Sequence, residues 1–217
     1  MARTNLLDLQ NITAEMPVIG FTGALGSGCT YLSKGLVQHY NYAYCSLSET
    51  IHEAAREAGE KETTRNLQDI GNEVRRRYGR DALVRLALQR LDRSLPHRES
   101  SDGTKGVVVD GIRNAGEVEA LRGFPNFFLI SVQAGTGVRK HRTVDEGIRF
   151  DSEDDFLAAD SRDQDEQMDC GQQVKECNYQ ADIIVLNEPA EETSTNAHKP
   201  YRDYIREALY DPYISLI

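Results

Sequence analysis

Residues 17–30 read Pro-Val-Ile-Gly-Phe-Thr-Gly-Ala-Leu-Gly-Ser-Gly-Cys-Thr. The spacing fits the pattern G-x-x-x-x-G-K-[ST], with Gly23, Gly28 and Thr30 in place and Cys29 at the lysine position. In this pattern the backbone N–H groups of a glycine-rich loop surround phosphate groups. The stretch therefore predicts a loop that binds the phosphates of a nucleotide, while its cysteine puts catalysis in doubt.

The flanking residues give this spacing its structural context. Residues 18–22 form a short apolar run that predicts a buried strand. Leu32, Leu36 and Val37 recur at helical spacing, so we expect a helix to begin near Gly28. A glycine loop that opens a helix directs N–H groups and the positive helix end toward an anion. The alternative is a glycine-rich turn that only joins a strand to a helix.

Three polar side chains could complete a nucleotide site. Thr30 could ligate a phosphate-bound Mg²⁺. Asp110 ends an apolar strand, where an acid would lie near the same Mg²⁺; a helix cap is the alternative. Arg113 follows closely and is placed for a bidentate phosphate contact, or for a surface ion pair. We expect Mg²⁺ with ATP or another nucleoside triphosphate on the loop formed by Gly23, Ala24, Leu25, Gly26, Ser27, Gly28, Cys29 and Thr30.

Composition narrows the class of protein. A chain of 217 residues suits one domain with a tail. The net charge of −10 argues against nucleic acid as a partner, and no apolar run approaches the ~20 residues of a membrane helix. The four cysteines form no C-x-x-C pair, so we expect reduced thiols and a cytoplasmic protein.

Apolar strand-like runs alternate with helical stretches along the chain. This order predicts an α/β fold of three layers, with a five-stranded parallel sheet and helices on both faces. The ligand is expected at the carboxyl ends of the strands. We assign a nucleotide-binding domain to residues 1–187, and a linker with an apolar helical tail to residues 188–217. The strands are predicted over residues 18–22, 43–48, 106–111, 127–132 and 181–187, and the helices over residues 64–78, 81–94, 115–122 and much of 135–180.

Several other arginine and amide side chains could each have one of two roles. Arg139 and Arg142 belong to a basic cluster that either closes over phosphates or forms a solvated helix face. Gln68 and Asn72 lie four residues apart on one helix face, where they could contact a base edge or simply face solvent. Arg75 begins a run of three arginines, of which one could be functional.

Several of these segments together resemble the P-loop nucleoside-monophosphate kinase-like proteins, near dephospho-coenzyme A kinase and phage-type deoxynucleoside monophosphate kinase. The matching segments are residues 23–30, 67–75, 109–118 and 181–187. Residues 171–174 and 181–183 are similar to the P-loop domain that precedes a deoxycytidylate deaminase domain in some bacterial proteins.

The resemblance implies a division of roles. Gly23–Thr30 would cradle a triphosphate, and Asn187 would lie near the adenine. Gln68 and Arg75 would belong to the acceptor-nucleotide region, and Arg113 would face the acceptor phosphate. A helical lid would contain the arginines of the basic cluster, Arg139 and Arg142. Residues 201–217 would lead into a deaminase domain in a longer parent chain.

Cys29 departs from the kinase pattern, because a neutral thiol cannot neutralise the migrating phosphoryl group. Three functions follow as alternatives. The first is a regulatory nucleotide-binding domain associated with deoxycytidylate deaminase. The second is an active monophosphate kinase whose cation comes from Lys34, Arg139 or Arg142. The third is a structural module that forms a homo-oligomer.

Overall fold

The computed structural model describes residues 9–95, 104–147, 149–164 and 169–188. The chain divides into two compact units, residues 1–187 and residues 188–217. Apart from Glu188, the second unit lies outside the described residues, and with it the predicted linker and apolar tail.

The first unit is built on a single sheet of five parallel strands in the order β2-β3-β1-β4-β5. Parallel neighbours need crossover connections, which helices supply here. This arrangement confirms the predicted α/β class with a five-stranded parallel sheet. The strands are β1 (Val18–Thr22), β2 (Ala43–Ser46), β3 (Val107–Ile112), β4 (Phe127–Gln133) and β5 (Ile183–Leu186).

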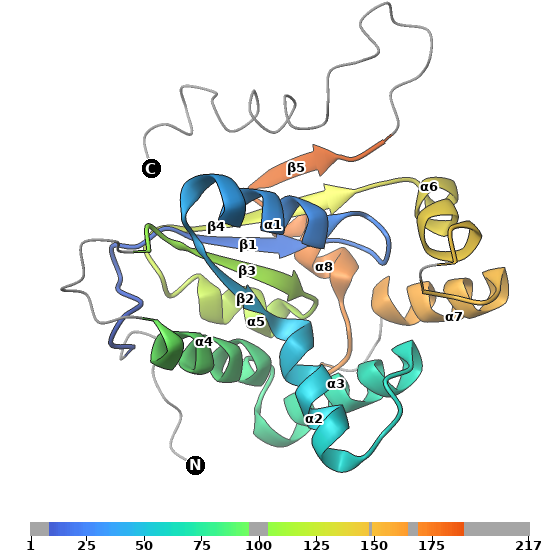
Figure 1. The fold of residues 1–217 in the computed structure, drawn as a ribbon, viewed down its shortest axis with the longest axis horizontal. Coiled ribbons are helices and arrows are strands. Elements are labelled where there is room, and N and C mark those ends of the chain that lie inside the picture. Colours follow the sequence, from blue (N-terminus) through green and yellow to red (C-terminus); the bar gives the residue numbers. More distant parts are fainter. Residues whose placement is uncertain (1–8, 96–103, 148, 165–168, 189–217) are drawn as a thin grey trace, which may run out of the picture. The chain divides into compact units, whose positions relative to one another are not determined.

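Helices cover both faces of the sheet. Figure 1 shows α1 on one side and α4, α5 and α8 on the other. The helices are α1 (Cys29–Tyr40), α2 (Leu47–Ala58), α3 (Thr64–Tyr78), α4 (Ala82–Ser94), α5 (Ala115–Leu121), α6 (Thr136–Lys140), the π-helix η2 (His141–Asp145), α7 (Glu153–Gln164) and α8 (Val174–Tyr179). No described helix has both the length and the apolar character needed to cross a membrane.

The second strand ends two residues earlier than its sequence predicts. The reason is a helix cap at Ser46, whose hydroxyl accepts a hydrogen bond from the N–H of Glu49 at 3.3 Å. A serine hydroxyl that accepts from the third residue beyond it is a common start signal for a helix. Helix α2 therefore begins at Leu47, inside the segment predicted as strand.

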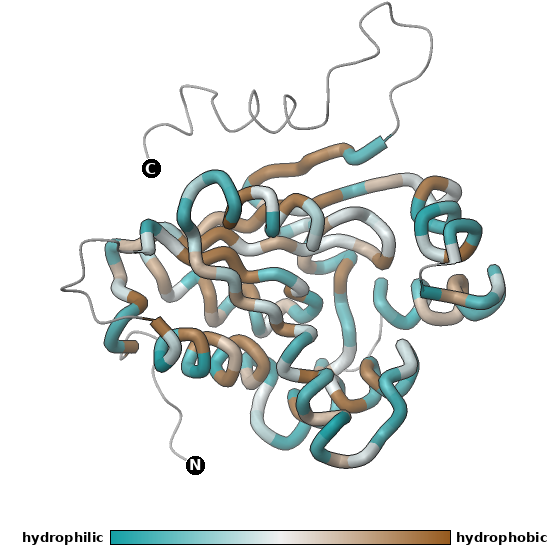
Figure 2. Tube along the Cα trace, in the orientation of Figure 1, coloured by the Kyte–Doolittle hydropathy of each residue, from teal (hydrophilic) through white to brown (hydrophobic). Residues whose placement is uncertain are grey.

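The main core lies between the sheet and the face covered by α4, α5 and α8. Val107, Val109 and Leu129 are fully buried there, and Figure 2 shows the strands as mostly hydrophobic. Side chains alternate between the two faces of a strand, so Asp110 points the opposite way from Val109. This alternation places Asp110 on the face that α1 covers.

The segment after β4 forms the helical lid that the sequence predicts. Figure 1 shows α6 and α7 beyond the carboxyl ends of β1 and β4. The segment contributes a small apolar cluster of its own. Phe150, Phe156 and Ala159 pack there with Leu25 of the glycine-rich loop. The lid therefore has an apolar attachment to the predicted phosphate-binding loop.

Candidate functional site

The loop between β1 and α1 has the backbone geometry of an anion site. Gly26 and Gly28 adopt φ values of 79° and 99°, which only glycine adopts at little cost. At Gly23 a Cβ atom would lie 2.4 Å from the carbonyl oxygen of Val132. The first turn of α1 contains no acidic residue and its N-cap makes no side-chain hydrogen bond. A free helix N-terminus of this kind attracts a negatively charged group.

Asp110 lies near the carboxyl end of β3, next to Thr30 at the start of α1, and is almost fully buried. Its Oδ2 accepts hydrogen bonds from the hydroxyl of Thr30 at 2.8 Å and from that of Tyr44 at 2.7 Å. Its Oδ1 is buried and has no hydrogen-bond partner among the described residues. A hydroxyl and an unsatisfied carboxylate oxygen are the hard donors that Mg²⁺ prefers, so this pair fits a magnesium ion bound together with phosphate.

Protein ligands alone do not form a metal centre in this region. Among the described residues, no group of three or more histidine, cysteine, aspartate or glutamate side chains could hold a metal ion. Magnesium usually keeps only one or two protein ligands and takes others from substrate phosphates. The pair formed by Thr30 and Asp110 is consistent with that mode of binding.

Tyr44 was missed by the sequence interpretation. Burial and the negative charge of Asp110 raise the pKa of its phenol, so Tyr44 stays protonated and donates to the carboxylate. The sequence gives no signal for this contact, which depends on Tyr44 lying in the strand next to β3. Their register pairs Tyr44 with Val108, two residues before Asp110.

The thiol of Cys29 is neutral in the folded protein. Desolvation of its sulfur raises the pKa of Cys29 to about 12, and the charge of Asp110 acts in the same direction. A contact of 3.4 Å with the Ser27 hydroxyl and the positive charge of Arg113 only partly oppose this shift. The start of a helix often lowers the pKa of a cysteine, but here desolvation outweighs it.

Lys34 does not replace the missing lysine in this structure. Its side chain is exposed, and its Nζ lies 6.0 Å from the centroid of the Tyr44 ring. That separation is within the range of a cation–π contact. Lys34 therefore faces the aromatic ring of β2, and its placement does not support the predicted supply of a cation.

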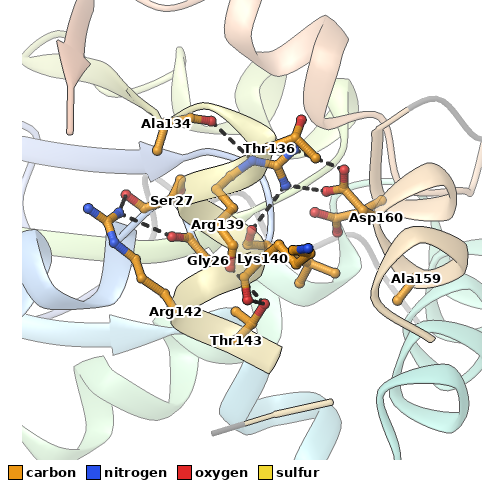
Figure 3. A network of polar contacts seen from close by, with 12 residues as sticks. Gly26, Ser27, Ala134, Thr136, Arg139, Lys140, Arg142, Thr143, Ala159 and Asp160 are labelled. Carbon is orange, nitrogen blue, oxygen red and sulfur yellow. Dashed lines mark hydrogen bonds and ion pairs between the residues drawn. The ribbon is translucent and has the colours of Figure 1, made fainter. Parts of the chain in front are cut away.

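Arg139 is buried, and protein acceptors engage each of its nitrogens. Its two Nη atoms donate to Asp160 at 2.5 and 2.9 Å, and Nη1 also donates to the carbonyl of Leu25 at 3.1 Å. Its Nε donates to the carbonyl of Ala134 at 3.1 Å (Figure 3). Arg139 thus ties the lid to the loop backbone, and this placement does not favour its predicted contact with phosphate.

Arg142 and Asn187 donate hydrogen bonds to backbone carbonyls of the loop. Arg142 donates to the carbonyl of Gly26 at 3.3 Å and to that of Asn187 at 3.0 Å (Figure 3 shows its approach to Gly26 and Ser27). Asn187 donates from Nδ2 to the carbonyl of Ser27 at 2.7 Å. In a planar trans peptide the N–H points away from the carbonyl, so holding the Ser27 carbonyl directs the Gly28 N–H the other way. Both residues therefore orient the loop backbone.

Arg113 is the predicted cation that the fold brings to the loop. It follows β3, and its Nη1 donates to Asp163 at the end of α7. Its side chain is 22% exposed, and its positive charge acts on both Cys29 and Asp110. The structure thus gathers the loop, Thr30, Asp110 and Arg113 in one place.

The two predicted substrate-binding residues of α3 are both buried. Gln68 donates from Nε2 to the carbonyl of Ala159 at 3.0 Å, which ties α3 to α7. Arg75 donates from Nε to Glu117 at 2.8 Å, with both side chains at most 1% exposed. Arg75 is therefore occupied in a buried ion pair, and this placement favours a structural role over the predicted contact with substrate.

The acidic partners of these arginines also went unpredicted. Asp160 and Asp163 belong to an acidic stretch that looks like solvated helix surface in the sequence. In α7 both are buried and face Arg139 and Arg113. No local pattern distinguishes them from their exposed neighbours, because burial here depends on what α7 packs against.

Comparison with known proteins gives relatives in archaea. No family model matches the chain. A UPF0200 protein of Methanoculleus marisnigri is 29% identical over 174 residues, which cover 80% of this chain and 88% of that protein. Among solved structures, shikimate kinase from Aquifex aeolicus matches with a TM-score of 0.44 and 16% identity, over 92% of this chain and 98% of that one. A UPF0200 protein of Methanothrix thermoacetophila is 30% identical over 138 residues, which cover 63% of this chain and 70% of that protein, and the chain accordingly belongs to the UPF0200 family.

Proposed function

We propose that this protein binds a nucleoside triphosphate with Mg²⁺ at the loop of residues 23–30. The observation that carries the proposal is the uncapped start of α1 beside Thr30 and Asp110. The free N–H groups would hold phosphate oxygens. Thr30 and the unsatisfied Oδ1 of Asp110 would hold the metal, which would neutralise charge between the phosphates.

We further propose that binding dominates over phosphoryl transfer. The lysine position carries a neutral thiol, and the lid arginine Arg139 is fully engaged by protein acceptors. Losing one electrostatic contact to a transition state costs a factor of about 10²–10³ in rate. A protein that binds ATP and turns it over slowly suits a regulatory role better than a metabolic one.

The alternative is an active nucleoside-monophosphate kinase with a relocated cation. One observation favours it, namely that the positive charge of Arg113 acts to lower the pKa of the Cys29 thiol. Arg113 would then neutralise the phosphoryl group in place of a lysine. The acceptor would be a nucleoside monophosphate, bound between α3 and the lid.

The association with a deoxycytidylate deaminase domain rests on the resemblance of residues 171–174 and 181–183 alone. It stays a prediction, as does a cytoplasmic location. A search of the parent reading frame beyond residue 217 for H-x-E and P-C-x-x-C motifs tests the association.

The experiment measures Mg²⁺–ATP binding by calorimetry and ATP-dependent phosphorylation across nucleoside monophosphates. The variants are Cys29→Lys and, as an uncharged control of similar length, Cys29→Met. We expect the wild type to bind ATP, Cys29→Lys to raise the transfer rate about 10²–10³-fold, and Cys29→Met to leave it low.

Two results would contradict this reasoning. Absence of binding of any triphosphate to the wild type would refute the proposed function. Fast transfer by the wild type that Cys29→Lys does not increase, and that Arg113→Gln abolishes, would establish the alternative kinase function instead.

A further inference from the structure

The ion pair between Arg113 and Asp163 joins two distant parts of the site. Arg113 follows β3 beside the loop, whereas Asp163 lies near the end of α7 in the lid. The Asp163 side chain is 1% exposed and that of Arg113 is 22% exposed. A charged group this deeply buried needs several polar partners to offset its lost hydration.

Asp163 lacks those partners. Only Oδ1 accepts from Arg113, through Nη1, and Oδ2 is buried without a hydrogen-bond partner among the described residues. An arginine and a carboxylate usually form two parallel hydrogen bonds, which this pair does not. The contact is thus half satisfied, and a group with more oxygens and more charge would be a better partner for Arg113.

A second cation stands near the same carboxylate. Arg149 donates to the hydroxyl of Thr64 at 3.3 Å at the start of α3. Desolvation of its head group and the charge of Arg113 lower the pKa of Arg149 to about 10, although the residue as a whole is exposed. The charges of Arg113 and Arg149 repel each other, and the negative charge of Asp163 acts on both of them.

We propose that Asp163 is an internal stand-in for a phosphoryl group, and that a phosphate monoester displaces it from Arg113. The proposal rests on the proposed function, since the phosphoryl group would enter beside the nucleotide loop. In the free protein the carboxylate holds Arg113 in place. In the bound protein a doubly charged phosphate with three oxygens takes over the contact with Arg113 and also offsets the charge of Arg149.

This role predicts a gain of affinity where a merely structural role predicts none. Removing the carboxylate charge removes a competitor for Arg113. The test measures the binding of inorganic phosphate by calorimetry to the wild type and to Asp163→Asn. We expect Asp163→Asn to bind phosphate about tenfold more tightly, the scale of one charged contact.

Asp69→Asn is the matched control. Asp69 of α3 pairs with Arg162, the neighbour of Asp163 in α7, at 2.6 Å, but this pair lies at the exposed surface. Its substitution changes the net charge equally and is expected to alter phosphate affinity less than twofold. A rise of equal size in both variants would overturn the proposal, because it would reflect net charge alone.

A third variant locates the bound phosphate. Adding Arg113→Gln to Asp163→Asn should abolish the gain, and a gain that persists would overturn the proposal. Unchanged or weaker phosphate binding in Asp163→Asn would overturn it as well. Should Asp163→Asn fail to fold, the carboxyl-carbon NMR signal of Asp163 in the wild type must shift on titration with phosphate, and a constant signal would refute displacement.

The same samples separate this proposal from the proposed function. Mg²⁺–ATP is titrated into the wild type in parallel. Failure to bind ATP with a tenfold phosphate gain in Asp163→Asn would refute the nucleotide function and support the stand-in. ATP binding without that gain would support the nucleotide function and refute the stand-in.

Discussion

Replacing Arg75 with methionine removes a buried guanidinium group while keeping most of the aliphatic length. In the folded protein Arg75 and Glu117 are 1% and 0% exposed at the side chain, and their Nε and Oε1 atoms lie 2.8 Å apart. The variant would leave the carboxylate of Glu117 buried without its cation. Glu117 would keep two backbone donors, the N–H groups of Arg113 and Asn114 at 2.8 and 3.1 Å.

The size of the effect follows from this geometry. Breaking a buried ion pair by removing one partner costs about 3–5 kcal/mol, because one charge stays uncompensated. The two remaining N–H donors offset part of that cost, so we expect the free energy of unfolding to fall by about 3 kcal/mol. Adding Glu117→Gln removes the uncompensated charge, and the double variant should be more stable than Arg75→Met alone.

The assay is urea unfolding, with the free energy extrapolated to water. The control is Arg76→Met, since Arg76 is the next residue of α3 and its pair with Glu73 is 63% and 36% exposed. We expect this control to lose less than about 1 kcal/mol. If Arg75→Met lost as little while weakening the binding of nucleoside monophosphates, the structural role would be refuted and the predicted substrate contact would stand.

The remaining predictions concern the loop. Asp110→Asn should weaken ATP binding in the presence of Mg²⁺ about tenfold and leave binding in EDTA unchanged, as measured by calorimetry; equal losses in both conditions would exclude a metal ligand. Arg142→Ala should weaken ATP binding about tenfold by releasing the loop carbonyls, whereas Lys140→Ala, at an exposed pair in the same segment, should not. The pKa of Cys29, raised from its ordinary 9.0 to about 12, keeps the thiol protonated, so at pH 8 iodoacetamide should modify it about a thousandfold more slowly in the folded protein than in urea. The same raised pKa contributes stability below pH 9 that is lost as the pH rises toward 12, and rapid modification of folded Cys29, read by peptide mass spectrometry, would contradict both statements.

The local patterns of the sequence were sufficient for most of the fold. The apolar run of β1 and the glycines after it predicted the strand, the loop and the start of α1. Helix α3 was predicted at its observed bounds, since its periodicity spans four turns. The error at β2 arose because Ser46 and Ser48 are equally good capping residues in sequence, and in the structure Ser46 is the cap.

The site was predicted less completely than the fold. Asp110 and Arg113 were predicted to lie near the loop because the ends of parallel strands meet at one edge of the sheet, which is a consequence of topology. Arg139 was assigned to phosphate, but its partner proved to be Asp160 of α7, 21 residues away. Tyr44 and Asp163 were not identified at all, since nothing near them in sequence indicates their contacts with Asp110 and Arg113.

The sequence by itself determined the strands, the helices and the glycine loop, because these depend on backbone freedom and on periodicity within a few residues. It also determined that a thiol replaces the lysine. Only the tertiary structure decided which charges are available to a ligand. Arg75 is paired with Glu117, 42 residues away, in a buried ion pair. Arg113 donates a single hydrogen bond to Asp163, 50 residues away. The interaction energy of two charged groups depends on the distance between them and on how far they are shielded from water, and the fold alone sets both.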